Sequence, residues 1–252
     1  MKARISLGWL AAAAVGFAAL TATADELQTV EQKICTAWSK HKSIRAKLTT
    51  EMQMEQPGQK MESKGAGTYE MLRKGEKLLS RVDLKSTTTQ KMGDQEMKIE
   101  QSVLVVVDGE YAYALSETSM EFQGEKTPPQ KTATKSAIDP QMSGDPKLLF
   151  EHFRKDHELK LLPEQTVSGR KSFAIEATPK DRSPDNPIRS MVMCFDAETG
   201  CMNRMVVNGP DGKPMQTTTY SDAEFNVDLD PQRFAFKAPE GVEMMDLTKG
   251  KP

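Results

Sequence analysis

The sequence predicts a mainly β protein with a few helices, built on one large, curved antiparallel sheet. Apolar and polar residues alternate over residues 43–55, as they do in a strand with one solvated face. Asp108-Gly109 joins two apolar stretches and is a strong signal for a tight hairpin turn. Residues 188–220 read as strands separated by short turns, and short turns imply antiparallel neighbours. We expect such a sheet to hold a hydrophobic hollow rather than a catalytic centre.

The N-terminal segment 1–24 is predicted to be a cleaved secretory signal. Lys2 and Arg4 precede an apolar run over residues 7–20, and small residues at 22–24 fit a cleavage site. The alternative, a membrane anchor, suits this run poorly because a helical span needs about 20 apolar residues. The prediction is therefore an exported protein whose residues 25–252 form a single domain.

The charge balance gives no support for a nucleic-acid partner. The chain has a formal net charge of −2, which becomes about −4 when Lys2 and Arg4 leave with the signal. Nucleic-acid binding needs a clustered basic surface. Here the lysines are scattered along predicted strands, as on a solvated sheet face.

Two helices are expected to cover the sheet. The first spans residues 25–41, and the second begins at Asp145-Pro146 and runs to about residue 157, with a capping side chain followed by proline at the first helical position. Residues 117–144 carry prolines and little apolar pattern, so we expect an irregular lid or mobile insert there. The apolar stripe of the first helix, which must be buried against the sheet, consists of Leu27, Val30, Ile34 and Trp38.

The remaining apolar stretches predict about ten or eleven strands. Residues 103–107 are apolar at every position, so this strand is expected to be covered on both faces. Gly65 and Gly67 permit a bend or a bulge. The expected strands are residues 43–55, 61–73, 78–89, 95–107, 111–115, 159–167, 171–178, 188–195, 201–208, 213–220 and a closing strand at 233–236.

Three cysteines, Cys35, Cys194 and Cys201, would meet oxidising conditions in an exported chain. A bridge between Cys194 and Cys201, which flank one turn, is a candidate disulfide if the hairpin register lets them face each other. The alternatives are a bridge from Cys35 to the sheet, or three buried thiols. Metal binding is the weakest interpretation, because no Cys-x-x-Cys pair or paired histidine spacing is present.

No motif predicts catalysis. The chain lacks the Gly-x-Ser-x-Gly nucleophile turn, a phosphate-binding loop and a dinucleotide fingerprint. His41, His152 and His157 are the only histidines, and the last two are five residues apart, so they do not share a helix face. We therefore expect no catalytic residue, no metal and no cofactor. Methionine is abundant instead, and its flexible thioether suits surfaces that accept variable apolar partners, although core packing is its commoner role.

Several stretches resemble the periplasmic outer-membrane lipoprotein carriers, the LolA-like family. They are residues 43–49 behind the opening helix, the hairpin at 108–113, the acidic-to-glycine turn at 195–200, and the C-terminal 231–243 with its Pro-x-Gly-Val turn. The resemblance covers nearly all of residues 25–252. It implies an unclosed β-barrel capped by helices, whose hollow shields acyl chains of a lipoprotein received from a membrane-bound exporter. It also implies a role for an arginine near the end of an early strand, and Arg73 is the nearest match.

The leading hypothesis is therefore a monomeric periplasmic carrier that binds a lipoprotein or lipid, contacts a membrane-bound exporter or acceptor transiently, and performs no catalysis. The alternatives are an envelope sensor or protein-interaction module on the same scaffold and, least favoured, an exported hydrolase. With Arg73, the predicted lining of the hollow is Trp38, Met52, Met54, Tyr111, Tyr113, Phe173, Ile175, Met191, Met193, Phe195, Phe234 and Phe236.

Overall fold

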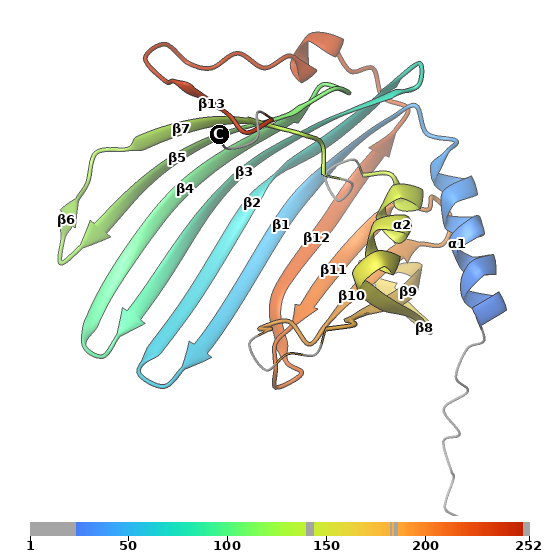
Figure 1. Cartoon of the computed structure of the whole chain (residues 1–252), viewed down its shortest axis with the longest axis horizontal. Helices are drawn as coiled ribbons and strands as arrows, with labels where there is room; N and C mark the ends of the chain where they lie inside the picture. The colour runs from blue at the N-terminus through green and yellow to red at the C-terminus, as the bar shows by residue number, and fades with distance from the viewer. Residues whose placement is uncertain (1–23, 140–143, 182, 184–185, 249–252) are drawn as a thin grey trace, which may run out of the picture.

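One thirteen-stranded sheet curves across the molecule, and two helices lie against one end of it (Figure 1). The computed structural model describes residues 24–139, 144–181, 183 and 186–248. The strand order is β13-β7-β5-β4-β3-β2-β1-β12-β11-β10-β9-β8, with β6 paired to β5, and the sheet is not closed into a barrel. Every pairing is antiparallel except that of β13 with β7. The predicted fold class is confirmed.

The elements follow the predicted order closely. The helices are α1 (Ala24–Trp38) and α2 (Pro146–Asp156), and a 3-10 helix spans Pro231–Phe234. The strands are β1 (Ser43–Gln56), β2 (Gln59–Lys74), β3 (Lys77–Met92), β4 (Gln95–Val107), β5 (Ala112–Phe122), β6 (Glu125–Lys126), β7 (Gln130–Ser136), β8 (His157–Val167), β9 (Arg170–Pro179), β10 (Ser190–Asp196), β11 (Met202–Asn208), β12 (Pro214–Phe225) and β13 (Met244–Asp246).

The sheet has two halves, one on each side of the pairing between β1 and β12. Within each half, neighbouring strands are close in sequence, apart from β13 and β7. Residues directly opposite each other in a ladder share a face. We call the face that carries α1 and α2 the inner face and the opposite one the outer face. Following the ladders from Met193, the inner face runs through Met205 and Thr218 to Thr50 and Gly65.

The helices bury their apolar stripes against β8, β9 and β10. Ile34 of α1 and Phe150 and Phe153 of α2 form one cluster with Ile175 and Phe195 of the sheet, and all five are at most 2% exposed. Asp145 caps α2 by accepting a hydrogen bond from the Lys147 N–H at 2.8 Å, as the sequence predicted. At the C-terminal end of α1, a Cβ on Gly200 would collide with the carbonyl oxygen of Ile34, so glycine allows the turn before β11 to pack closely against the helix.

The C-terminal segment crosses the outer face, which corrects the closing strand predicted at 233–236. Proline at the first position and the Asp230 cap favour the 3-10 helix Pro231–Phe234. Phe234 packs with Leu79 and Leu229 in a second cluster. Arg233 donates a hydrogen bond to the buried Glu70 at 2.8 Å, which fastens the segment to β2.

The stretch 117–144 was predicted to be irregular, and this is wrong for most of its length. It contains the end of β5, β6 and β7, while 140–143 lie outside the described residues. β7 is polar and threonine-rich, and it pairs with β5 along its whole length, so backbone pairing sets it although its side chains give no apolar pattern. Pro128 and Pro129 fall in the connection between β6 and β7.

Two finer predictions about the sheet are also corrected. Only Val106 and Val107 of the run 103–107 are buried, because the inner face at Val105 borders a cavity. Of the bend or bulge that Gly65 and Gly67 permit, the bulge is excluded, since the β2–β3 ladder runs in register from Gln59 to Lys74.

The predicted signal segment lies outside the described residues, apart from Ala24, which begins α1. Among the helices of residues 24–139, 144–181 and 186–248, none is long and apolar enough to span a bilayer.

Candidate functional site

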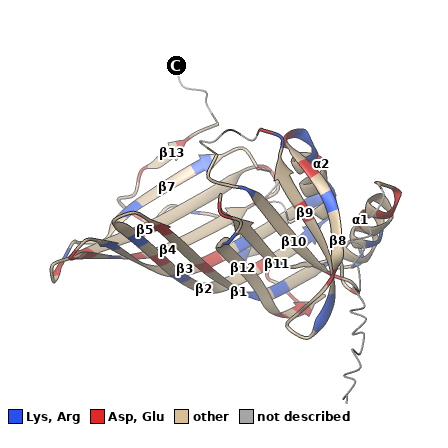
Figure 2. Cartoon of the chain, turned by 90° about the horizontal axis from the view of Figure 1, so that it is seen from below, with Lys and Arg blue, Asp and Glu red and all other residues tan. Residues whose placement is uncertain are grey.

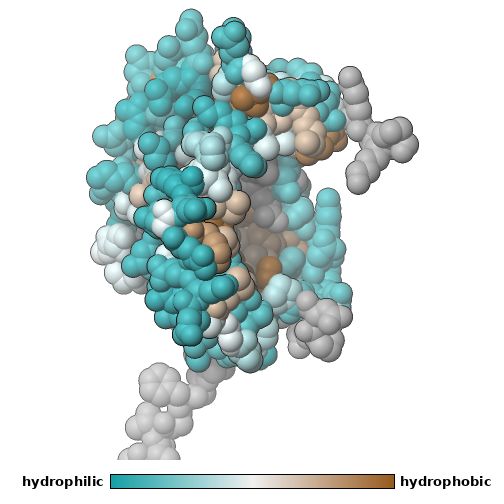
Figure 3. Space-filling model, turned by 90° about the vertical axis from the view of Figure 1, so that its left-hand side faces the viewer, coloured by the Kyte–Doolittle hydropathy of each residue, from teal (hydrophilic) through white to brown (hydrophobic). Residues whose placement is uncertain are grey.

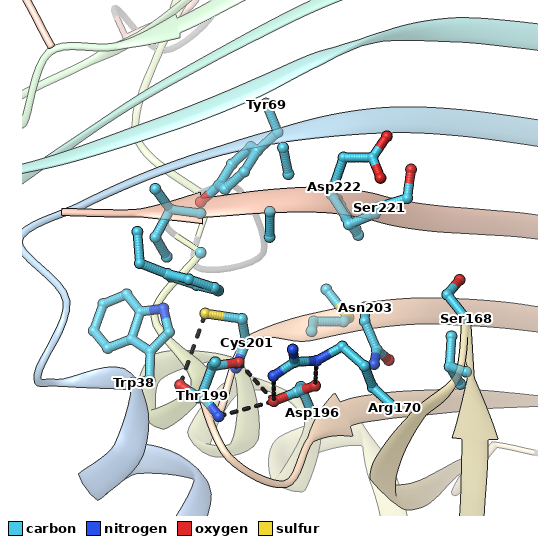
Figure 4. Close-up of a pocket in the computed structure, with 18 of the residues that line it drawn as sticks. Trp38, Tyr69, Ser168, Arg170, Asp196, Thr199, Cys201, Asn203, Ser221 and Asp222 are labelled. Carbon is cyan, nitrogen blue, oxygen red and sulfur yellow. Dashed lines mark hydrogen bonds and ion pairs between the residues drawn. The ribbon is translucent and has the colours of Figure 1, made fainter. Parts of the chain in front are cut away.

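A cavity of about 530 Å³ lies on the inner face beyond the end of α1 (Figure 4). Trp38, the last residue of α1, forms one wall. Ala46, Tyr69, Val82 and Val105 form another, and they stand opposite each other in register across β1, β2, β3 and β4. A single cross-strand row of the inner face is therefore the apolar floor of the cavity.

The cavity stays unfilled because the helices cover only part of the inner face. Their apolar stripes contact β8, β9 and β10, while β2 to β5 extend away from them (Figure 1). Val82 and Val105 consequently remain half-exposed on the inner face of their strands. The outer face of the same strands is partly covered. Figure 3 shows the result as a hollow with hydrophobic residues inside and a hydrophilic rim. Lys and Arg as well as Asp and Glu are distributed along the strands (Figure 2).

The sheet separates at one edge of this cavity. The β11–β12 ladder runs from Asn208 opposite Pro214 to Arg204 opposite Thr219 and ends there, whereas β12 continues to Phe225 paired with β1 alone. We call the gap between Met202–Asn203 of β11 and residues 220–225 of β12 the split. A β-bulge accompanies it, because the register with β1 shifts between Arg45 and Lys47.

The residues around the split are polar. Ser168, Arg170, Asp196, Asn203, Ser221 and Asp222 line the same cavity as the apolar floor. Ser172 and Asp196 lie opposite each other and share the outer face with Cys194 and Ala174, whereas Trp38 packs on the inner face. Because residues of both faces line one cavity, it reaches through the sheet at the split.

An ion-pair network holds the turn between β10 and β11 at the split. Arg170 is hydrogen-bonded to both oxygens of Asp196, and its Nη2 also donates to Glu198 at 3.1 Å. Asp196 Oδ1 accepts further hydrogen bonds from the Thr199 N–H at 2.9 Å and the Thr199 hydroxyl at 3.0 Å. Burial alone would raise the pKa of Asp196, but these donors and the guanidinium charge outweigh it and hold the pKa below its usual value. The Asp196 carboxylate therefore stays ionised, and its oxygens are engaged by Arg170 and Thr199.

Two tyrosines and a cysteine that line the cavity stay neutral. Burial raises the pKa values of Tyr69 and Tyr220, whose rings meet edge to face with centroids 5.6 Å apart, so both keep their hydroxyl protons. Burial also raises the pKa of Cys201 to about 12, so this side chain is a thiol rather than a thiolate nucleophile. The arrangement is suited to binding an amphiphile, and these groups are not poised for proton transfer near neutral pH.

Nine of the thirteen predicted lining residues are distributed over four places on the inner face. Trp38 lines the cavity. Met52 and Met54 are on the inner face but near the far end of β1. Arg73 lies near the cavity, with its guanidinium carbon 4.6 Å from the centroid of the Trp38 ring, and its Nε and Nη2 atoms are buried without a hydrogen-bond partner. Residues in or packed against the core under the helices are Phe173, Ile175, Met191, Met193 and Phe195.

The remaining four candidates are corrected, because the structure places them away from the hollow. Phe234 is buried on the outer face, and Phe236 stacks on Tyr113 with ring centroids 5.3 Å apart. Tyr113 lies opposite Val106, on the outer face of β5. The Lys135 ammonium sits 3.6 Å from the centre of the Tyr111 ring. These aromatic residues fasten the C-terminal segment and the edge of the sheet.

Most residues that line this cavity were not among those predicted from the sequence. Ala46, Val82, Val105 and Tyr220 all fall in predicted strands, so their place in the sheet was predictable. Which of two alternating faces meets the cavity depends on the helices and the cross-strand register. The split could not be predicted from the sequence. It is the point where the ladder between β11 and β12 ends, and neither strand carries a local sequence signal for that end.

The predicted bridge between Cys194 and Cys201 is also corrected: all three cysteines are free. Cys194 is buried on the outer face with Val167 and Ala174, whereas Cys201 packs beside Trp38 and Ile44. A register shift in the β10–β11 ladder after Cys194 sets the two sulfurs on opposite faces of the hairpin.

Comparison with known proteins gives partial likenesses. No family profile matches the chain. An uncharacterised protein of Methanocaldococcus jannaschii is 29% identical over 148 residues, which are 57% of this chain and 38% of that protein, so the chain spans well under half of that relative.

Similar solved structures include LolA-like proteins, the family that the sequence resembles. They include a LolA superfamily protein from Nitrosomonas europaea (12% identity, 83% of this chain and 97% of that one, TM-score 0.26). A putative outer-membrane lipoprotein-sorting domain from Vibrio parahaemolyticus gives 10% identity, 82% and 96% coverage and a TM-score of 0.30. MucB in the MucA/MucB complex of Pseudomonas aeruginosa gives 15% identity and a TM-score of 0.42, covering 82% of this chain and 59% of that one. At such TM-scores the function must be argued from the chain's own residues.

Proposed function

We propose that this protein binds an acyl chain of a lipid or lipoprotein in the cavity and shields it from water during transfer between membranes, without covalent chemistry. The observation that carries the proposal is the apolar row Ala46–Tyr69–Val82–Val105, which faces about 530 Å³ that the chain's own side chains leave unfilled. The volume falls within the range of roughly 300–1,000 Å³ typical of small-ligand sites. The secretory signal predicted over 1–24 would place this activity in the periplasm.

Burial of hydrocarbon supplies the driving force. Each methylene group removed from water contributes about 0.8 kcal/mol, so a chain of ten buried methylenes gains about 8 kcal/mol before the cost of ordering. A carrier must also release its cargo. Half-exposed walls at Val82 and Val105 suit this role, because the ligand can leave without any opening of the packed core under the helices.

The direct test places a charge on the cavity floor. Val105→Glu puts a carboxylate beside the ligand, and the neighbouring Leu104→Glu puts the same group on the outer face of the same strand. We expect Val105→Glu to weaken binding of a fluorescent fatty-acid probe at least about tenfold, because an unpaired charge beside hydrocarbon is costly. Leu104→Glu should bind within about twofold of the wild type, and far-UV circular dichroism should show β structure for both. Equal affinities of the two folded variants would rule out this row as the binding surface.

The cargo can be identified by native mass spectrometry of protein purified from the periplasm. Co-purified lipid or acylated protein supports a carrier, and transient contacts with a membrane-bound exporter or acceptor would then be sought by crosslinking. Protein that arrives empty and captures no acyl ligand contradicts the proposal. The role that the family resemblance implies for Arg73 belongs to this proposal, and Arg73→Leu in the same assay tests it.

A second candidate is a scaffold that grips an unlipidated polypeptide. The observation that favours it is the methionine-rich far end of the inner face, where Met54, Met61, Met97 and Phe122 lie in one cross-strand row with Gln90. Met120 and Phe122 there are 40% and 39% exposed. Capture of an unlipidated peptide that Phe122→Ser abolishes, with probe binding intact, would support this candidate over the carrier.

A further inference from the structure

We propose that the polar head of the bound amphiphile lies in the split between β11 and β12, and that the head accepted there is uncharged and donates a hydrogen bond. This inference rests on the proposed function. It adds the orientation of the ligand and the chemistry of its head group, neither of which follows from an apolar cavity alone.

The orientation follows from the two ends of the cavity. Trp38, Val82 and Val105 supply hydrocarbon and aromatic surface at one end. The other end is the split, where the lining side chains of Asn203, Ser221 and Asp222 are polar (Figure 4). An amphiphile gains most when its chain contacts the first end and its head the second, because an apolar group at the split would leave polar side chains without water.

Asn203 identifies what the head must offer. Its Oδ1 is buried without a hydrogen-bond partner, while its Nδ2 donates to Ser172 Oγ at 2.9 Å. The orientation of this amide is fixed by its neighbour, because the Ser172 hydroxyl donates to the Arg170 carbonyl oxygen and so can only accept from Asn203. An unsatisfied buried acceptor at a cavity wall favours a ligand with a hydroxyl or amide N–H.

The charges at the split disfavour an anionic head. Among the described residues that line the cavity, Arg170 is the only cation, and Asp196 and Glu198 already occupy its guanidinium group. Asp222 adds a carboxylate to the lining, and it is paired at 2.8 Å with Lys47, which lies outside it. At the split, a carboxylate or phosphate head would therefore meet carboxylates and, among the described lining residues, no free positive partner, whereas a glycerol or an amide would meet none of this repulsion. Arg73 stacks on Trp38, at the opposite end of the cavity.

The experiment compares two ligands with the same acyl chain, myristate and 1-monomyristoylglycerol, in competition with the fluorescent probe below their micellar concentrations. We expect the wild type to bind the monoacylglycerol about five- to tenfold more tightly than myristate. Asn203→Leu should weaken monoacylglycerol binding about three- to tenfold and leave myristate within about twofold. Asn208→Leu is the matched control, because Asn208 also donates its amide to a serine, Ser190 Oγ at 3.0 Å, but does not line the cavity.

Asp222→Asn keeps the test decisive if Asn203→Leu fails to fold. Asp222 has a φ of 50°, a conformation that asparagine also adopts, so the exchange removes charge without new backbone strain. It should strengthen myristate binding about two- to fivefold and change monoacylglycerol binding by a smaller factor, because only myristate carries a charge that Asp222 repels. Equal wild-type affinity for both ligands, or equal effects of Asn203→Leu on both, would overturn the placement of the head while leaving the apolar site intact. Binding of neither ligand would instead overturn the proposed function.

Discussion

The inner face of the sheet has two regions built from the same kind of sequence, and they differ in what covers them. Ile175, Met193 and Phe195 alternate with outward residues in β9 and β10, as Val82 and Val105 do in β3 and β4. The first three are at most 1% exposed under α1 and α2, whereas the two valines remain half-exposed beside the cavity. Alternation creates an apolar face, but only a covering element turns that face into core.

This difference assigns separate roles to the two regions. The covered region, β8 to β10 with both helices, supplies stability through close packing. The uncovered region, β1 to β4 beside Trp38, keeps its apolar surface available to a ligand. Substitutions of the same type should therefore change stability in the first region and binding in the second.

The largest contrast is expected from charge insertion. Met193→Glu would place an unpaired carboxylate at a position that is 0% exposed, and we expect a loss of more than about 4 kcal/mol in the free energy of unfolding, or no folded protein. Val105→Glu should lose less than about 1.5 kcal/mol, because water reaches its side chain. Urea denaturation followed by circular dichroism measures both. A folded Met193→Glu variant of wild-type stability would show that the covered region is not packed as described.

Enlarging a side chain should separate the regions in the opposite sense. Ile175→Phe adds volume to a filled core and should cost about 1–3 kcal/mol. Val82→Phe places the same ring in the cavity, where we expect a stability change below about 0.5 kcal/mol and weaker binding of the fluorescent probe. Thermal unfolding and probe titration of the two variants test this pair. A destabilised Val82→Phe with unchanged probe affinity would indicate that the cavity is already occupied by protein.

Acid should weaken one anchor in each region. Asp196 holds the turn beside the covered region, and Glu70 holds the C-terminal segment behind the uncovered one. Although burial opposes it, hydrogen bonds from Arg170 and Thr199 lower the pKa of Asp196, and those from Arg233 and Arg45 lower that of Glu70. A carboxylate whose pKa is lower in the folded state than in the unfolded state stabilises the fold at pH values above its unfolded-state pKa, which is about 3.8 for Asp196 and about 4.5 for Glu70. This stabilisation is lost as the pH falls through the folded-state pKa of each group.

We therefore expect the free energy of unfolding to fall below about pH 4.5, with a shallower slope in Asp196→Asn and in Glu70→Gln. Urea unfolding at a series of pH values measures the slopes. A variant whose slope equals that of the wild type would show that its carboxylate does not contribute this pH dependence.

The smallest effect concerns the thiols. Cys194 is buried in the sheet and Cys201 borders the cavity, and burial raises the pKa of both, that of Cys201 to about 12. We expect neither to react with iodoacetamide at pH 8 in the folded protein, and dithiothreitol to leave the melting temperature unchanged because no disulfide is present. Mass spectrometry after alkylation, with urea-unfolded protein as the control, checks both points. A bridge between Cys194 and Cys201 in the purified protein would contradict the hairpin register.

The elements were largely predictable from sequence. The alternation over 43–55, the Asp108-Gly109 turn and the Asp145-Pro146 cap are local signals, and the structure has β1, the β4–β5 hairpin and α2 at those places. Prediction failed where structure depends on a distant partner. β7 is a strand because β5 pairs with it, and Phe234 is buried because the C-terminal segment crosses the outer face to reach Leu79.

The sequence by itself determined a mainly antiparallel sheet, its turns and two amphipathic helices, because hydrophobic period and turn chemistry act between near neighbours. Only the tertiary structure decided which apolar residues are core and which line a cavity, since this depends on where the helices stop along the sheet. It also decided where β11 and β12 separate, because the length of a ladder is set by bulge and register between strands rather than by either strand alone. The cavity exists because two short helices cannot cover a sheet of thirteen strands.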